Sequence, residues 1–471
     1  MAPSDGQTRR QVIGGIAGVA GAVAASALTP EQALAGGPEE RPFRADTFGQ
    51  RPTGRPNVLV ILGDDLGWAD LSSYGSPDIR TPHLDRLARD GVRFTNGYSA
   101  AAVCSPTRFA LYTGRYPGRL RGGLSEPIAR AHELEGLPPG HPTLASLFKG
   151  AGYTTAMYGK WHCGFLPWFS PLRSGWDEFF GNFSGGLDYY SKVSHLGQHD
   201  LYEGEVPVES LDYYTDTVAD RAAAFVRRPH RRPWLLNLNF TSPHWPWEAP
   251  GDRAVSAELT ARLRAGESGA LFHRDGGSLD TYRKMVENLD RAVGQVLTAL
   301  RQTGQERDTV VVFASDNGGE RFSHQWPLTG GKGGLEEGGI RVPTILRWPA
   351  RVRPGQVSHE PVVTQDWTAT LVEIAGARPD PGHPFDGASL AGYLLRGEPA
   401  PERALFWRTK GNRALRLGRW KYFRGAGGSD TLYDLVADPR EQANRARQQP
   451  DLVGALRSRW EAIDATLLRY P

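Results

Sequence analysis

The chain has 471 residues, of which 39% are hydrophobic and 23% charged, and its formal net charge is +3. These values are typical of a globular protein with a full hydrophobic core, and so small a charge argues against a nucleic-acid-binding surface. The only cysteines, Cys104 and Cys163, permit at most one disulfide.

The first 35 residues have the pattern of an export signal. Arg9 and Arg10 precede a run rich in Gly and Ala, and an A-x-A sequence ends at Ala35. A basic start, an apolar run and a small-residue cleavage site are typical of a signal peptide, and the paired arginines indicate the bacterial twin-arginine route. A transmembrane anchor is the alternative, but the run is short and weakened by glycine. We expect residues 1–35 to direct export or secretion, with the twin-arginine translocase as partner and no stable membrane insertion.

The elements after the signal follow a regular order. Residues 36–56 are polar and rich in Gly and Pro, which predicts a linker or an arm around the domain. Continuous apolar runs predict buried strands, and they lie at 57–65, 153–162, 234–244 and 308–319. Helices are predicted at 81–91, with Thr81 as N-cap and Pro82 in the first turn, and at 278–304. The second has a stripe at helical spacing, which consists of Met285, Leu289, Val293, Val296 and Leu300.

This alternation of strands and helices sets the fold class. Strands that alternate with helices predict an α/β domain in which helices sandwich a mostly parallel, mixed sheet. We assign residues 57–398 to this domain. From about Pro399 the pattern changes to short strands separated by turns and closed by a helix at 450–468. Residues 399–471 are therefore predicted to form a small C-terminal α+β domain with an antiparallel sheet.

Charged or metal-competent side chains follow all four predicted strands. They are Asp64 and Asp65, Lys160 and His162, His244, and Asp316 and Asn317. A single Asp after a strand is more often a turn former or helix cap, but ligands gather beyond the carboxyl ends of such strands. Three carboxylates and an amide oxygen suit a hard divalent cation, calcium or magnesium. Adjacent carboxylates also need a cation to coexist, so we expect a metal site here.

Cys104 opens a further predicted helix, in the sequence CSPTR. Four interpretations are open: half of a disulfide, a thiol nucleophile, a metal ligand or a residue modified after translation. The helix start favours an anion beside Cys104, and Arg108, one turn along, faces the same spot. Lys160 and His162 alternate onto one face of their strand, whereas Cys163 points to the opposite face. That arrangement weakens the disulfide interpretation.

The sequence CSPTR resembles the C-x-P-[ST]-R signature of the sulfatase family, in which the cysteine is oxidised to formylglycine. Further family motifs are matched in order from about Asn57 to the C-terminus, and they are GDDLG, TGRYP, GYTTAMYGKWHCG, TSPH, SDNGG and GGKGGLEEGGIRVP. Together they are similar to the arylsulfatase branch of the alkaline phosphatase superfamily. Cys163 departs from the family, which more often has an apolar residue there, but cysteine packs as a small hydrophobe.

The resemblance implies a metal site and a modified nucleophile. Hydrated formylglycine has two geminal hydroxyls, one to attack sulfur and one to expel sulfate. The implied cation is calcium, with magnesium as the alternative. Its implied ligands are an oxygen made from Cys104 and the side chains of Asp64, Asp65, Asp316 and Asn317.

The resemblance also implies a role for each remaining polar residue. Arg108, Lys160 and His162 hold the hydrate, and Asp316 is the base for the attacking hydroxyl. His244 and Lys332 bind the sulfate group, with His244 as the acid for the leaving alcohol. The expected partner during maturation is a formylglycine-generating enzyme.

We therefore expect a sulfuric ester hydrolase of the arylsulfatase type, which cleaves aryl or carbohydrate sulfate monoesters to an alcohol and inorganic sulfate. One alternative is a phosphate or phosphonate monoester or diester hydrolase of the same superfamily, which the cysteine signature and Lys332 disfavour. Another is a sulfated-glycan-binding protein without turnover. Trp245, Trp247 and Trp326 lie near these motifs and either stack on a substrate ring or only pack.

Overall fold

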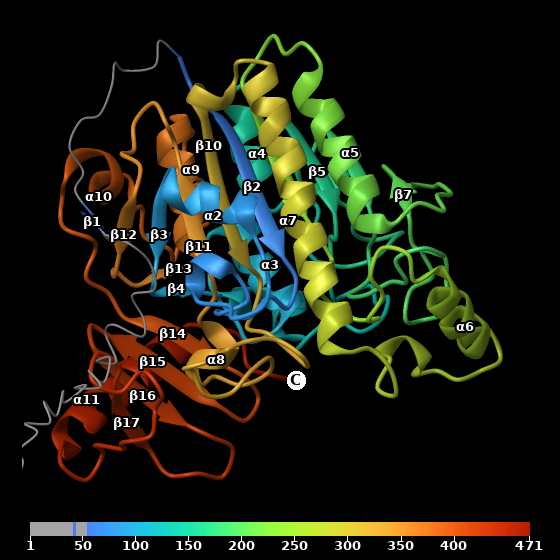
Figure 1. Cartoon of the computed structure of the whole chain (residues 1–471). Helices are drawn as coiled ribbons and strands as arrows, with labels where there is room; N and C mark the ends of the chain where they lie inside the picture. Colours follow the sequence, from blue (N-terminus) through green and yellow to red (C-terminus); the bar gives the residue numbers. More distant parts are fainter. Residues whose placement is uncertain (1–40, 44–53) are drawn as a thin grey trace, which may run out of the picture.

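The computed structural model describes residues 41–43 and 54–471. The predicted signal at 1–35 and most of the predicted arm at 36–56 lie outside these residues. A large sheet with helices on both faces forms most of the described chain, and a smaller sheet lies below it near the C-terminus (Figure 1). The α/β class and the small antiparallel sheet predicted from the sequence are both confirmed.

The large sheet has eleven strands. They are β1 (Arg41–Pro42), β2 (Asn57–Gly63), β3 (Val92–Phe94), β5 (Thr154–Gly159), β6 (Glu178–Gly181), β7 (Tyr202–Glu203), β8 (Val206–Pro207), β9 (Trp234–Asn239), β10 (Thr309–Ser315), β11 (Thr344–Arg347) and β12 (Gln356–Ser358). Their order is β1-β12-β3-β11-β10-β2-β9-β5-β6-β7-β8. The run from β10 to β6 is parallel, whereas β11, β7 and β8 pair antiparallel with their neighbours. A separate parallel pair joins β4 (Gly97–Tyr98) to β13 (Val362–Val363).

Helices cover both faces of this sheet because its central strands are apolar on both sides. On β2, Leu59 and Ile61 pack into one core cluster, while Val58, Val60 and Leu62 pack into the other. The first face is covered by α2 (Pro82–Arg89), α5 (Tyr214–Arg227) and α7 (Leu279–Gln302). The second is covered by α3 (Cys104–Thr113), α4 (Leu144–Gly150), α9 (Thr364–Ala375) and α10 (Ala391–Arg396). Outside these layers lie α6 (Arg253–Arg264) and α8 (Glu337–Ile340) (Figure 1).

The long helix α7 follows its predicted pattern. The five predicted stripe residues, Met285, Leu289, Val293, Val296 and Leu300, are all fully buried. Burying each such side chain contributes roughly 2 kcal/mol relative to leaving it exposed. The helix begins after Ser278, whose side chain accepts a hydrogen bond from the Thr281 N–H, and Gly304 follows its end at φ +72°.

The start of α2 differs in detail from the prediction. Thr81 occupies the N-cap position, but its side chain accepts no capping hydrogen bond. The N–H groups of His83 and Leu84 instead donate to the carboxylate of Asp290, at 3.1 and 2.8 Å. Asp290 lies on α7, so a neighbouring helix supplies the cap.

The small sheet has four antiparallel strands in chain order, and they are β14 (Leu405–Arg408), β15 (Arg413–Leu417), β16 (Trp420–Arg424) and β17 (Thr431–Asp434). One face packs on α11 (Pro450–Asp464), where Tyr422 and Trp460 share a core cluster. On the other face, Trp407 contacts Tyr98 and shares a core cluster with Ala110 of α3. The division predicted at 398/399 remains a prediction. Within the described ranges, no helix has both the length and the apolarity to cross a bilayer.

Candidate active site

Neighbouring strands of the sheet end level with one another and bring distant residues to one edge. The paired residues at this edge are Ser315 with Gly63, Leu62 with Asn239, and Asn239 with Gly159. The polar residues that follow these strand ends directly are Asp64, Lys160 and Asp316, and Phe240 follows β9. This edge, which the carboxyl ends of parallel strands form, is where ligands bind in open α/β sheets.

All four predicted strands end before their predicted limits, with β2 ending at Gly63 and β10 at Ser315. The strand predicted at 153–162 ends at Gly159, and the one at 234–244 ends at Asn239. Gly159 has φ +101°, and a Cβ built on it would lie 1.8 Å from the Asn239 carbonyl oxygen. Lys160 and His162 therefore lie on a loop and not on the common strand face that was predicted, and His162 adopts φ +53°.

Asp64, Asp65, Asp316 and Asn317 meet as predicted, and all four are buried. The Asp65 N–H donates to Asp316 Oδ1 at 3.3 Å, and Asn317 Nδ2 donates to Asp65 Oδ1 at 2.7 Å. The amide oxygen of Asn317 is buried without a hydrogen-bond partner. Burial, together with Asp316, raises the pKa of Asp64 to about 8. Three crowded carboxylates and an unpaired amide oxygen are a donor set suited to a hard cation.

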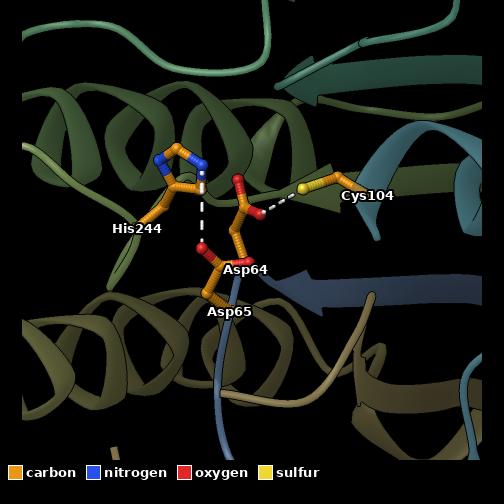
Figure 2. Close-up of side chains that lie close together, drawn as sticks. All are labelled: Asp64, Asp65, Cys104 and His244. Carbon is orange, nitrogen blue, oxygen red and sulfur yellow. Dashed lines mark hydrogen bonds and ion pairs between the residues drawn. The ribbon is translucent and has the colours of Figure 1, made fainter. Parts of the chain in front are cut away.

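Cys104 begins α3 and points at these carboxylates. Its Sγ donates to Asp64 Oδ1 at 3.4 Å (Figure 2). Ligand atoms of Asp64, Asp65, Cys104 and His244 all lie within 4.8 Å of one another. Burial and the neighbouring Asp64 raise the pKa of the Cys104 thiol well above its usual value. Cys163 is buried too, and both cysteines are free, so the structure has no disulfide between them.

Three buried or half-buried cations surround the carboxylates. Arg108 donates from Nε and Nη2 to Asp316 Oδ2, at 3.1 and 2.8 Å, and from Nη1 to the Lys160 carbonyl at 2.9 Å. The Lys160 ammonium lies 2.5 Å from Asp64 Oδ2. The Lys332 ammonium lies 2.6 Å from Asp65 Oδ2. Although burial opposes its charge, Asp65 raises the pKa of Lys332 well above its usual value.

Two buried histidines complete the set. His162 donates from Nε2 to the Ile128 carbonyl at 2.8 Å, and its Nδ1 has no hydrogen-bond partner. His244 Nδ1 lies 2.8 Å from the Trp245 carbonyl, while its Nε2 faces Asp65 Oδ2 at 3.6 Å (Figure 2). Burial and the nearby lysines hold the pKa of His244 well below 6.5, so the resting imidazole is neutral.

The sequence did not single out Glu320 or Asp70. Glu320 Oε2 accepts a hydrogen bond from the Lys332 ammonium at 3.1 Å at the rim of the site. Asp70 is buried and accepts from the Gly67 N–H, the Tyr282 hydroxyl and the His324 N–H, at 2.6, 2.6 and 2.7 Å. It therefore ties the loop after β2 to the loop after β10. The sequence signal that could have identified these two acids was their position, because Asp70 follows the predicted ligand pair Asp64 and Asp65, and Glu320 follows the pair Asp316 and Asn317, by a few residues each.

The three tryptophans near the motifs differ in exposure. Trp247 is 2% exposed and contacts Tyr282 and Phe322 edge-on, so it packs in the core. Trp245 is half-buried beside His244. Trp326 is 67% exposed and lies under the Arg440 guanidinium.

Comparison with known proteins decides the family. The family model described as Sulfatase matches residues 56–377. The chain belongs to the sulfatase family. This sulfatase is 32% identical over 395 residues to N-acetylgalactosamine-6-sulfatase of Rattus norvegicus. The aligned region covers 78% of this chain and 71% of that protein. It is 33% identical over 455 residues to steryl-sulfatase of Mus musculus, covering 78% and 69%.

Solved structures agree with this family. The crystal structure of Ps i-CgsB in complex with k-i-k-neocarrahexaose has a TM-score of 0.77 at 28% identity, and the match covers 87% of this sulfatase and 92% of that chain. The sequence-based recognition of the family is thus confirmed. The protein is a sulfuric ester hydrolase, and neither alternative function is favoured.

Proposed function

We propose that this sulfatase hydrolyses aryl or carbohydrate sulfate monoesters with a formylglycine made from Cys104 and a bound divalent cation. The observation that carries the proposal is the placement of Cys104 at a helix start, with its Sγ 3.4 Å from Asp64 inside a cluster of carboxylates and cations. The roles of the individual residues, given below, are part of the same proposal.

The donor set fits a cation. Asp64 is buried beside Asp65 and Asp316, and burial, followed by repulsion from Asp316, raises its pKa to about 8. The unpaired Asn317 Oδ1 supplies a neutral oxygen. Oxygen ligands favour calcium, with magnesium as the alternative. A bound cation supplies Lewis acidity toward a sulfate oxygen.

The thiol itself is unsuited to catalysis. Its pKa is raised by burial and by Asp64, so it stays protonated near neutral pH. Conversion of Cys104 to hydrated formylglycine supplies one hydroxyl to attack sulfur and a second to release sulfate. The Asp316 carboxylate, held by Arg108, is our choice of base.

Arg108, Lys160 and His162 hold residue 104 in place. Arg108 binds both the Asp316 carboxylate and the Lys160 carbonyl, which fixes the loop after β5 against α3. The unpaired Nδ1 of His162 is buried in the same loop, and burial with Lys160 holds its pKa well below 6.5. Because Nε2 donates to the Ile128 carbonyl, Nδ1 of the neutral imidazole can accept one hydrogen bond.

Lys332 and His244 bind the sulfate group. When all three aspartates are ionised they carry −3, and the cations Arg108, Lys160 and Lys332 carry +3, so the charges of these side chains balance. The cation makes the site net positive, which suits a sulfate ester whose charge moves onto the bridging oxygen during cleavage. His244 is our choice of acid for the leaving alcohol.

We also propose the order of maturation. The paired Arg9 and Arg10 suit twin-arginine export, a route that carries folded proteins. Cys104 is buried in the folded chain, so a formylglycine-generating enzyme must act before folding is complete. Modification, metal binding and folding then all precede export.

The test is sulfate release together with peptide mass spectrometry of residue 104. We expect active protein to carry formylglycine, and protein from a host without the converting enzyme to fold but turn over little. Cys104→Ala is expected to be inactive, whereas the control Cys163→Ala should lose some stability through packing and little activity. An unmodified thiol in fully active protein would contradict the proposal.

A further inference from the structure

Lys332 lies on a loop that runs from Thr329 to α8. The Gly338 N–H donates to the Thr329 carbonyl at 2.7 Å, so the two ends of the loop meet. On the side of the catalytic sheet, the Lys332 N–H donates to the Gly319 carbonyl at 3.0 Å. The opposite side of the loop faces the small C-terminal sheet, beside β14 and α8 (Figure 1).

Both ends of this loop are attached to two consecutive residues of the C-terminal segment after β17. The Thr329 hydroxyl donates to the Arg440 carbonyl at 2.6 Å. The Glu337 N–H donates to Glu441 Oε2 at 2.7 Å. Glu441 has φ +55°, a left-handed conformation that is uncommon for a non-glycine residue. Such backbone conformations persist only where the surrounding structure holds them.

A buried ammonium joins the same two glutamates. Lys421 Nζ, on β16, lies 3.0 Å from Glu337 Oε1 and 2.8 Å from Glu441 Oε1. The side chains of Lys421 and Glu337 are fully buried, and that of Glu441 is 2% exposed. The second Glu337 oxygen accepts from the Tyr98 hydroxyl at 2.6 Å. Removal of the Lys421 charge leaves Glu441 buried without its cation and leaves Glu337 with only the more distant Arg341 Nη1, at 3.6 Å, so these groups hold the loop as one unit.

We propose that Lys421 and Glu441 are positioning residues for Lys332. Through Glu337 and Thr329 they hold the loop so that the Lys332 ammonium stays beside Asp65, at the place proposed for the sulfate group. The inference rests on the proposed function, in which Lys332 binds sulfate. It gives the C-terminal sheet a part in the reaction, because a lysine of that sheet fixes a lysine of the site.

A double-mutant cycle separates this role from a merely structural one. We expect Lys421→Met to lower kcat/KM for 4-nitrophenyl sulfate on the order of tenfold or more, because small displacements of a binding group are costly. In a Lys332→Ala background, the same substitution is expected to change kcat/KM by less than about twofold, because interacting residues are not additive. A structural role predicts the same fold-loss in both backgrounds.

Thr329→Val repeats the cycle at an exposed position, where it removes the hydroxyl that donates to the Arg440 carbonyl and keeps the side-chain shape. This second cycle decides between the two roles if Lys421→Met does not fold. Arg419→Met is the matched control, because it removes a surface ion pair with Asp434 on the same sheet, and kcat/KM should not change. Equal losses in both backgrounds, or unchanged kcat/KM in Lys421→Met and Thr329→Val, would overturn the inference. Unchanged kcat/KM in Lys332→Ala alone would instead contradict the role proposed for Lys332.

Discussion

His244 illustrates how the site sets the chemistry of one residue. Its Nδ1 faces the Trp245 carbonyl at 2.8 Å, and its Nε2 faces Asp65 at 3.6 Å. The hydrogen bond to the Trp245 carbonyl favours the neutral tautomer that carries its proton on Nδ1. Because burial, Lys332 and Lys160 hold its pKa well below 6.5, His244 can act as an acid only after an anionic substrate offsets the lysine charges.

We expect His244→Ala to slow sulfates of weakly acidic alcohols far more than sulfates of acidic phenols. Only a poor leaving group needs a proton in the transition state, and general acid catalysis contributes roughly a hundredfold to ten-thousandfold. The measurement is kcat/KM across a series of phenyl sulfates. His195→Ala is the control. The ring centroids of His195 and Trp245 are 6.1 Å apart, so His195 lies near the same side chain as His244, and it is assigned no proton transfer. An equal loss across the series would move the acid role to Lys332.

The carboxylates and Asn317 were accessible from sequence because they follow buried strands, whereas Cys104, Arg108 and Lys332 were identified through the family motifs. Asp64 and Asp316 end apolar runs, and in a parallel sheet such ends meet. Glu320 was not accessible in this way, because its contact with Lys332 depends on how two glycine-rich loops fold against each other. The environment of His244 was equally hidden, since its pKa depends on burial and on lysines from distant loops.

At the scale of elements, α2 depends on α7 for its start. The Asp290 carboxylate accepts hydrogen bonds from the His83 and Leu84 N–H groups, a contact across 206 positions of the chain that local sequence rules cannot detect. The same limit explains the length of β5. Alternation suggested a strand to residue 162, but Gly159 turns the backbone where it approaches the Asn239 carbonyl.

We expect Asp290→Ala to destabilise the protein by about 1–2 kcal/mol, as the loss of a helix cap does. Asp290→Asn keeps an oxygen acceptor and should cost less. Thr81→Val tests the sequence-based alternative, in which Thr81 supplies the cap, and here we expect a smaller effect than for Asp290→Ala because Thr81 accepts no capping bond. Urea unfolding at constant pH measures all three. A larger loss in Thr81→Val than in Asp290→Ala would reverse the assignment.

At the scale of the whole molecule, the sheet gathers the site from segments far apart in the chain. Asp65 and Asn317 are separated by 252 positions, more than half of the sequence, yet Asn317 Nδ2 lies 2.7 Å from Asp65 Oδ1. The C-terminal sheet adds a second layer of support through Trp407, which packs near the start of α3. Binding of a cation where these segments meet is therefore expected to stabilise the fold.

Removal of the metal should reveal that coupling. We expect chelation to abolish activity and lower the melting temperature, and calcium to restore both, because a ligand bound only by the folded state stabilises it by about 2.7 kcal/mol at a hundredfold excess over Kd. Magnesium, tested in parallel, identifies the preferred ion. Asn317→Ala lacks the unpaired amide oxygen and should need more calcium for the same shift. Full activity in a sample shown to be metal-free would contradict the cation proposal.

The pH dependence of the chelated protein provides an independent readout of the same site. The pKa of Asp64 is raised from 3.8 to about 8 in the folded chain, chiefly by burial and by Asp316. The folded state therefore binds this proton more tightly than the unfolded state, so the contribution to stability is present below about pH 4 and is lost as pH rises through 8. With calcium bound, the carboxylate is paired and this loss should disappear. The expected result is a melting temperature that falls between pH 5 and 8 more steeply with chelator than with calcium, measured by differential scanning calorimetry, and equal slopes would show that Asp64 does not face the cation.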